Sequence, residues 1–167
     1  MLSLTELAGL TRELGTTRVL TAYVDARVTD PAMREAWRPA LATAVAAARA
    51  GVESGEERAA FDRAAAFLQN PEPPLGGVWG DPAWAAFLTA DGPRYSGNLP
   101  VRVPTLAVWR DGPVVSPYVR ALKQHRPVAV VLVDSGSARF YRYAWGSLAA
   151  LPDLTLSSPE DAGDPQA

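Results

Sequence analysis

The chain has 167 residues, of which 48% are hydrophobic, a formal net charge of -2 and a mean hydropathy of -0.03. This composition predicts one ordinary domain, or one domain plus part of a second, with a normal buried core. The chain has no cysteine and a single histidine, which excludes disulfides, thiolate nucleophiles and metal sites built from cysteine or histidine clusters. No apolar run approaches the ~20 residues that span a bilayer, and the first residues lack a secretory signal pattern. We therefore expect a cytoplasmic protein without a membrane partner.

Helical capping patterns and apolar spacing organise the first part of the chain. Capping boxes predict helices over residues 3–15 and 54–70. The apolar residues Val19, Leu20, Tyr23 and Val24 predict a strand over residues 18–26. A stripe of apolar residues predicts a helix over residues 31–50, in which Pro39 should cause a kink or a restart.

Proline and glycine then interrupt the pattern. Residues 71–82 hold four prolines and three glycines, so we expect an irregular connection there. Residues 84–88 and 106–109 are predicted strands, whereas residues 91–104 are expected to be irregular.

The last elements are a short helix and a hairpin. Residues 116–126 begin with Ser-Pro and end with basic residues, which is typical of a helix. The unbroken apolar run over residues 128–133 predicts a strand covered on both faces. A turn at residues 134–137 and a strand over residues 138–143 complete the hairpin. Residues 151–167 form a polar, acidic segment that we expect to be disordered.

The order of these elements is α-β-α-α-β-β-α-β-β. It predicts an α/β fold of the mixed α+β kind, in which two long helices between residues 31 and 69 form a layer on a mixed β-sheet. The C-terminal β-hairpin is expected to join this sheet.

Charge is distributed unevenly along the chain. Residues 1–93 carry 8 basic and 12 acidic side chains, and residues 143–167 carry four acidic and no basic ones. Residues 94–142 carry only two acidic side chains against eight basic ones, which are Arg94, Arg102, Arg110, Arg120, Lys123, Arg126, Arg139 and Arg142. Such a segment indicates a phosphate-binding face if its cations share one surface. The alternative is that these cations are scattered over several faces, where they only keep the surface hydrated.

Aromatic side chains accompany these cations on the last predicted strand. With a period of two, one side of the strand carries Arg139, Tyr141, Tyr143 and Trp145. Guanidinium groups beside aromatic rings are typical of RNA-contacting surfaces, and equally of protein interfaces. Trp79, in the irregular connection, is a second candidate for stacking on a base or a partner.

Catalytic and metal-binding patterns are sparse. His125 stands at a predicted helix end with no orienting group near it in sequence, which favours a structural or solvent-facing role over a catalytic one. A carboxylate site for Mg²⁺ would have to use Asp25, Asp30 and Asp134. Turn-forming aspartates are the commoner alternative. We expect no cofactor.

The hairpin also carries a family resemblance. The run VAVVLVDSGSARF, behind the helix PYVRAL, resembles the opening hairpin of the middle domain in bacterial relatives of the archaeal–eukaryotic peptide-chain release factors. This group includes the Balon-type hibernation factors, which occupy the ribosomal A site. VLTAYVDAR, and WAAFLTADG leading to LPVRVPTLAVW, resemble the N-terminal domain of the group. The resemblance implies a release-factor-like N-terminal domain over residues 1–126, the opening hairpin of a truncated middle domain over residues 127–150, and a tail over residues 151–167.

The chain departs from the family at its functional motifs. True release factors carry a Gly-Gly-Gln tip, whereas the one Gly-Gly pair here, Gly76-Gly77, is followed by Val78. The stop-codon motifs of the N-terminal domain are missing as well.

Three functions therefore stay open. The first is a non-catalytic, ribosome-associated protein that binds rRNA or tRNA through its basic segment. The second is the N-terminal part of a peptidyl-tRNA hydrolase whose catalytic loop is absent from this sequence. The third is an oligomerisation module that uses the C-terminal hairpin as its interface.

Overall fold

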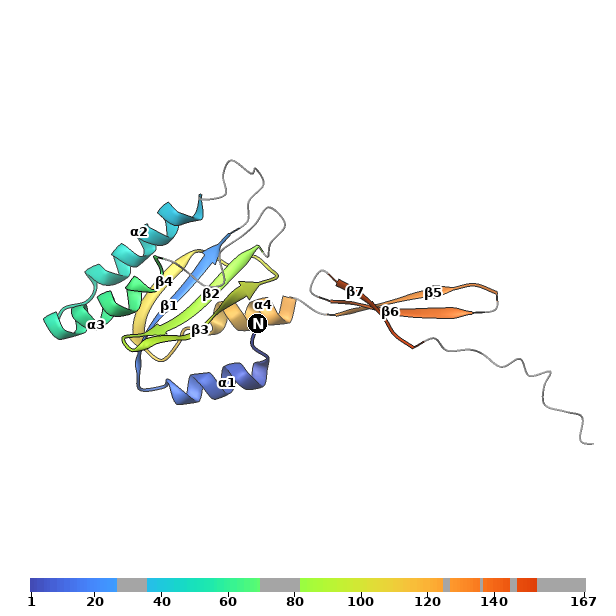
Figure 1. The fold of residues 1–167 in the computed structure, drawn as a ribbon, viewed down its shortest axis with the longest axis horizontal. Helices are drawn as coiled ribbons and strands as arrows, with labels where there is room; N and C mark the ends of the chain where they lie inside the picture. The colour runs from blue at the N-terminus through green and yellow to red at the C-terminus, as the bar shows by residue number, and fades with distance from the viewer. Residues whose placement is uncertain (27–35, 70–81, 125–126, 136, 145–146, 153–167) are drawn as a thin grey trace, which may run out of the picture. The chain divides into compact units, whose positions relative to one another are not determined.

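The structure, a computed structural model, describes residues 1–26, 36–69, 82–124, 127–135, 137–144 and 147–152 (Figure 1). The chain forms two units, Met1–Gln124 and His125–Ala167, and each unit contains one β-sheet. The assignment of these regions to the domains of a family stays a prediction. Residues 153–167 of the expected tail lie outside the described residues.

The first unit is built on a four-stranded antiparallel sheet with the strand order β3-β2-β1-β4. Its strands are β1 (Arg18–Asp25), β2 (Ala83–Thr89), β3 (Gly92–Leu99) and β4 (Leu106–Asp111). Every residue of β2 is buried, and so are residues 19–24 of β1. The two central strands are therefore covered on both faces.

Helices cover both faces of this sheet (Figure 1). They are α1 (Leu4–Glu13), α2 (Trp37–Ala50), α3 (Gly55–Ala66) and α4 (Ser116–Gln124). On one face, Leu20, Trp84 and Leu88 of the sheet share a core with side chains of α2 and α3. On the other face, Tyr23 and Phe87 share a core with side chains of α1 and α4.

The mixed α+β class and the layer of two long helices are confirmed, as are strands β1, β2 and β4. The layer formed by α1 and α4 on the second face was not predicted. The expectation of one mixed sheet that includes the hairpin was wrong, because the hairpin belongs to a separate antiparallel sheet.

Pro39 lies in the first turn of its helix. α2 begins at Trp37, and residues 31–35 of the predicted helix lie outside the described part of the chain. The N–H groups of a first helical turn have no partner within the helix, so a proline there removes no hydrogen bond. Of the two predicted outcomes, the structure shows a helix that starts just before Pro39.

Strand β3 corrects the expectation that residues 91–104 are irregular. The sequence GPRYSGNL has few β-formers, but the strand lies at an edge of the sheet, where proline is tolerated. Its register against β2 shifts between Phe87 and Leu88, so that Pro93 pairs with Leu88. Gly92, with φ of 142°, opens the strand in a backbone conformation that favours glycine.

The two predicted capping boxes differ in the structure. Ser3 and Glu6 form both reciprocal hydrogen bonds at the start of α1. Ser54 accepts a hydrogen bond from the Glu57 N–H at 3.0 Å, which is one half of the predicted box. The Glu57 carboxylate accepts from Trp109 Nε1 at 3.0 Å and lies 3.0 Å from Nε of Arg18. It therefore ties α3 to the sheet.

The second unit is a three-stranded antiparallel sheet with the order β5-β6-β7. Its strands are β5 (Val128–Val133), β6 (Ala138–Ala144) and β7 (Ser147–Ala150). The hairpin of β5 and β6 follows the sequence prediction, whereas β7 was not predicted. The expectation that β5 is covered on both faces was wrong, because five of its six residues are exposed and the sixth is half-buried.

Two hydroxyl groups of β1 hold the connection between β4 and α4. The Val114 N–H donates to Thr21 Oγ1 at 3.0 Å, and the Tyr23 hydroxyl donates to the Val114 carbonyl oxygen at 2.7 Å. Thr21 and Tyr23 are fully buried. Both backbone groups of Val114 are thereby satisfied by side chains of a central strand, which fixes the chain where it enters α4.

Replacing Thr21 by valine should destabilise the first unit. Thr21→Val keeps the shape of the side chain but removes the acceptor for the Val114 N–H, so we expect a loss of roughly 1–2 kcal/mol in the free energy of unfolding. Urea unfolding would measure it. Thr43→Val is the matched control, because the Thr43 hydroxyl donates to the Pro39 carbonyl on an exposed helix face, and its effect should stay within about 0.5 kcal/mol. Equal effects of the two substitutions would contradict the role of Thr21.

Candidate binding surfaces

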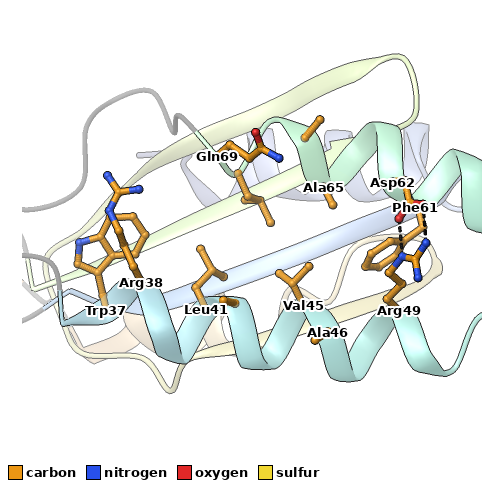
Figure 2. A pocket seen from close by; sticks show the side chains of 13 residues that line it. Trp37, Arg38, Leu41, Val45, Ala46, Arg49, Phe61, Asp62, Ala65 and Gln69 are labelled. Atoms are coloured by element: carbon orange, nitrogen blue, oxygen red, sulfur yellow. Dashed lines mark hydrogen bonds and ion pairs between the residues drawn. The ribbon is translucent and has the colours of Figure 1, made fainter.

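An apolar groove lies between α2 and α3 (Figure 2). Its volume is about 600 Å³, and Phe61 and Leu68 of the α3 region contribute to its lining. Leu41 and Val45 point from α2 into the space between the two helices. The facing sides of the helices also carry alanines, including Ala42, Ala46, Ala65 and Ala66. These small side chains do not fill the space between the helices, so the groove follows from the alanine-rich sequence.

Charged groups mark the two ends of the groove (Figure 2). At one end, Arg49 donates from Nε and Nη2 to the two carboxylate oxygens of Asp62 at 2.6 and 2.8 Å. At the other end, the guanidinium of Arg38 lies 4.8 Å from the centre of the Trp37 ring, in cation–π contact. The volume is that of a small-molecule site. Its apolar walls suit an apolar or amphipathic molecule.

The bidentate pair shifts the pKa values of both partners. Hydrogen bonds from Arg49, together with its charge, hold the pKa of Asp62 below its ordinary value, and the reciprocal interaction raises the pKa of Arg49. Both side chains are about half exposed. A pair in contact with water contributes little to stability, so its structural effect is to bridge the two helices.

The predicted cations of the first unit do not form one surface. Arg94, on edge strand β3, pairs with Glu13, and Nη2 of Arg102 lies 2.5 Å from the Asp25 carboxylate. Arg110 is on β4, the opposite edge of the sheet, and donates to the backbone carbonyl of the next residue at 3.2 Å. Two of the three are therefore engaged with carboxylates.

Arg120 and Lys123 are brought together. They lie three residues apart on α4 and thus on one side of that helix. Both are exposed, and neither forms an ion pair with another described residue. Arg126, the next predicted cation, lies outside the described residues, as do Trp79, Trp145 and His125.

Strand β6 places its predicted residues on two faces. The pairing register sets Arg139, Tyr141 and Tyr143 opposite Leu132, Val130 and Val128 of β5, so these three side chains share one face. Arg142 lies opposite Ala129 and belongs to the other face. Arg139 and Tyr143 are exposed, and Tyr141 is half-buried.

Two of the three candidate magnesium ligands form other interactions in the structure. Asp25 pairs with Arg102, as described above. Asp134 accepts hydrogen bonds from the Ser137 N–H and hydroxyl at 3.0 and 3.1 Å, which closes the β5–β6 turn. Asp30 lies outside the described residues. Within the ranges that the structure describes, no group of three histidine, cysteine, aspartate or glutamate side chains could hold a metal ion.

Sequence reasoning missed the groove and the network around Glu57. The groove depends on how far apart two helices pack, and an alanine-rich pattern alone does not give that distance. The network joins residues 39 and 52 positions apart in sequence.

Among the described residues, no helix is long and apolar enough to cross a membrane.

Comparison with known proteins shows similarity to solved structures only. No protein-family model matches the chain, and no curated protein matches its sequence. An archaeal translation termination factor is similar with a TM-score of 0.48 and 16% identity, covering 96% of this chain and 46% of the other. A structure described as an archaeal protein is similar with a TM-score of 0.47 and 16% identity, covering 99% and 49%. This chain thus spans about half the length of either.

Removing Arg49 should return the carboxyl group of Asp62 to ordinary behaviour. In Arg49→Gln, we expect the pKa of Asp62 to rise, because the hydrogen bonds that lower it are lost. NMR titration of the Asp62 carboxyl would measure this pKa. Arg63→Gln removes an arginine from α3, the helix that carries Asp62, and is the control that should leave the pKa unchanged. The small stabilisation from the pair is present above the unfolded-state pKa of Asp62, and it disappears as the pH falls through the lower folded-state pKa. An unchanged pKa in Arg49→Gln would contradict the assignment.

Proposed function

We propose that this chain is a non-catalytic, ribosome-associated protein that binds RNA, and that it does so through one face of the C-terminal sheet. The face consists of Arg139, Tyr141 and Tyr143, and is called the Arg–Tyr face below. Arg120 and Lys123 of α4 supply a second, purely electrostatic contact. The observation that carries the proposal is the presence of a guanidinium and two phenol rings on one face of a single strand.

The chemistry of this face suits single-stranded RNA. Proteins that read RNA on a sheet stack unpaired bases on aromatic rings and hold the phosphates with basic side chains. Successive residues on one face of a strand are roughly 7 Å apart, which is the spacing of Arg139, Tyr141 and Tyr143 along β6. Tyr143 is 46% exposed, so its ring is accessible to a base. Stacking would add to the salt-dependent attraction between arginine and phosphate.

The link to translation is supported by the sequence resemblance to release-factor relatives. The absence of Gly-Gly-Gln and of a histidine-based catalytic set supports binding over hydrolysis. The peptidyl-tRNA hydrolase alternative gains no support from the groove, because its ionisable lining residues are the paired Arg49 and Asp62, together with Arg38.

Charge reversal on the proposed contacts tests the proposal. In Arg120→Glu combined with Arg139→Glu, we expect weaker binding to ribosomes and to single-stranded ribosomal RNA, and a shallower dependence of affinity on salt, because fewer counterions are released. Co-sedimentation and fluorescence anisotropy at two salt concentrations would measure both quantities. Tyr143→Ala should cost about 1–3 kcal/mol of binding free energy if its ring stacks on a base.

A matched control distinguishes the contribution of the Arg–Tyr face from a general effect of net charge. Arg63→Glu combined with Arg142→Glu changes the net charge equally, but these residues lie on α3 and on the opposite face of β6. We expect this control to bind nearly as well as the wild type. Equal losses in both double variants would mean that charge alone governs binding. Absence of any RNA or ribosome binding by the wild type would overturn the proposed function.

A further inference from the structure

Strand β5 has the composition of a central strand but lies at the edge of its sheet. In the described part of the second unit it pairs with β6 alone. Its six residues are Val, Ala, Val, Val, Leu and Val, without a charge, a proline or a glycine. Edge strands leave a row of backbone N–H and C=O groups available for pairing, and proteins usually protect them with charged residues, prolines or bulges.

The edges of the first sheet show that protection. β3 carries Pro93 and Arg94 and has a register shift against its neighbour. The other edge strand, β4, ends in Arg110 and Asp111. Edge strand β5 has no such feature.

Exposure of the β5 side chains adds a driving force for association. Val133 is 74% exposed, Leu132 56%, Val128 53% and Val131 45%. Val133, Leu132 and Val128 are among the most exposed large apolar side chains that the structure describes, and together they lie on both faces of the strand. Removing apolar surface from water stabilises an association by roughly 25 cal/mol per Å².

The charge pattern favours a second copy of this chain as the partner. An uncharged strand can pair with itself in antiparallel orientation, because only valine, alanine and leucine then face each other in any register. The nearest cations, Arg139 and Arg142, are on β6, one strand from the seam. The two β6 strands of such a pair would lie three strand spacings apart, about 14 Å. This exceeds the screening length of about 8 Å at physiological salt, so the arginines would not oppose the pairing.

We propose that β5 pairs antiparallel with β5 of a second copy, so that the two three-stranded sheets form one continuous six-stranded sheet. The symmetry axis is perpendicular to the sheet, because an antiparallel edge pairing requires it. Corresponding faces of the two copies therefore lie on the same side of the six-stranded sheet. This inference does not rest on RNA binding, since it uses the strand edge and not the Arg–Tyr face.

Single cysteines can detect the pairing, because the chain has no cysteine of its own. We would introduce Ala129→Cys, Val130→Cys, Val131→Cys and Leu132→Cys one at a time into the full chain. Residues close to the symmetry axis meet their own counterparts within disulfide distance. Oxidation should therefore link the two chains at one or two adjacent β5 positions, as seen by non-reducing electrophoresis. Leu148→Cys is as exposed as Leu132 but lies on β7, the other and shorter edge strand of this sheet, and should remain unlinked.

Light scattering over a wide range of protein concentration provides an independent test. The wild type should form a dimer that Val131→Lys abolishes, because a lysine on an edge strand opposes pairing. Leu148→Lys adds the same charge on β7 and should leave the dimer intact. Circular dichroism would verify that both variants are folded. A wild type that stays monomeric throughout, or crosslinking that is equal at all β5 positions and at Leu148→Cys, would overturn the proposal.

Discussion

The first unit depends on the requirement that its two central strands be buried on both faces. β1 and β2 carry large apolar side chains in both directions, such as Trp84 toward one face and Phe87 toward the other. One helical layer would leave half of these side chains in water. Because the sheet must be covered twice, α1 and α4 are needed as much as α2 and α3. The hydroxyl groups of Thr21 and Tyr23 then fix the chain where it enters α4.

The second unit shows what happens when a fully apolar strand lacks such cover. β5 is even more apolar than β1, but within the described residues no helix lies in its unit. Its side chains are exposed, and the proposed pairing uses its backbone edge. The groove between α2 and α3 differs from β5, because Leu41, Phe61 and Leu68 along it already belong to the buried core.

Local patterns allowed most elements to be predicted. Capping residues located α1 and α3, and apolar runs located β1, β2, β4 and the β5–β6 hairpin. β3 could not be found in this way, because an edge strand with Pro93 and Gly92 has the composition of a loop. The prediction that β5 is buried was wrong for another reason. An apolar run shows which side chains a strand could bury, but not which other element covers them. Likewise, the count of cations in residues 94–142 contained no information on their positions.

The two proposed surfaces of the second unit can operate together because they use different parts of one sheet. Pairing at an edge occupies backbone groups and leaves both faces of a strand accessible. A two-fold axis perpendicular to the sheet would set the Arg–Tyr faces of both copies on the same side. One RNA strand could then contact two such faces, and the second contact would benefit from the high effective concentration that the first creates. A single weak face of three side chains would in this way gain affinity without any additional residue.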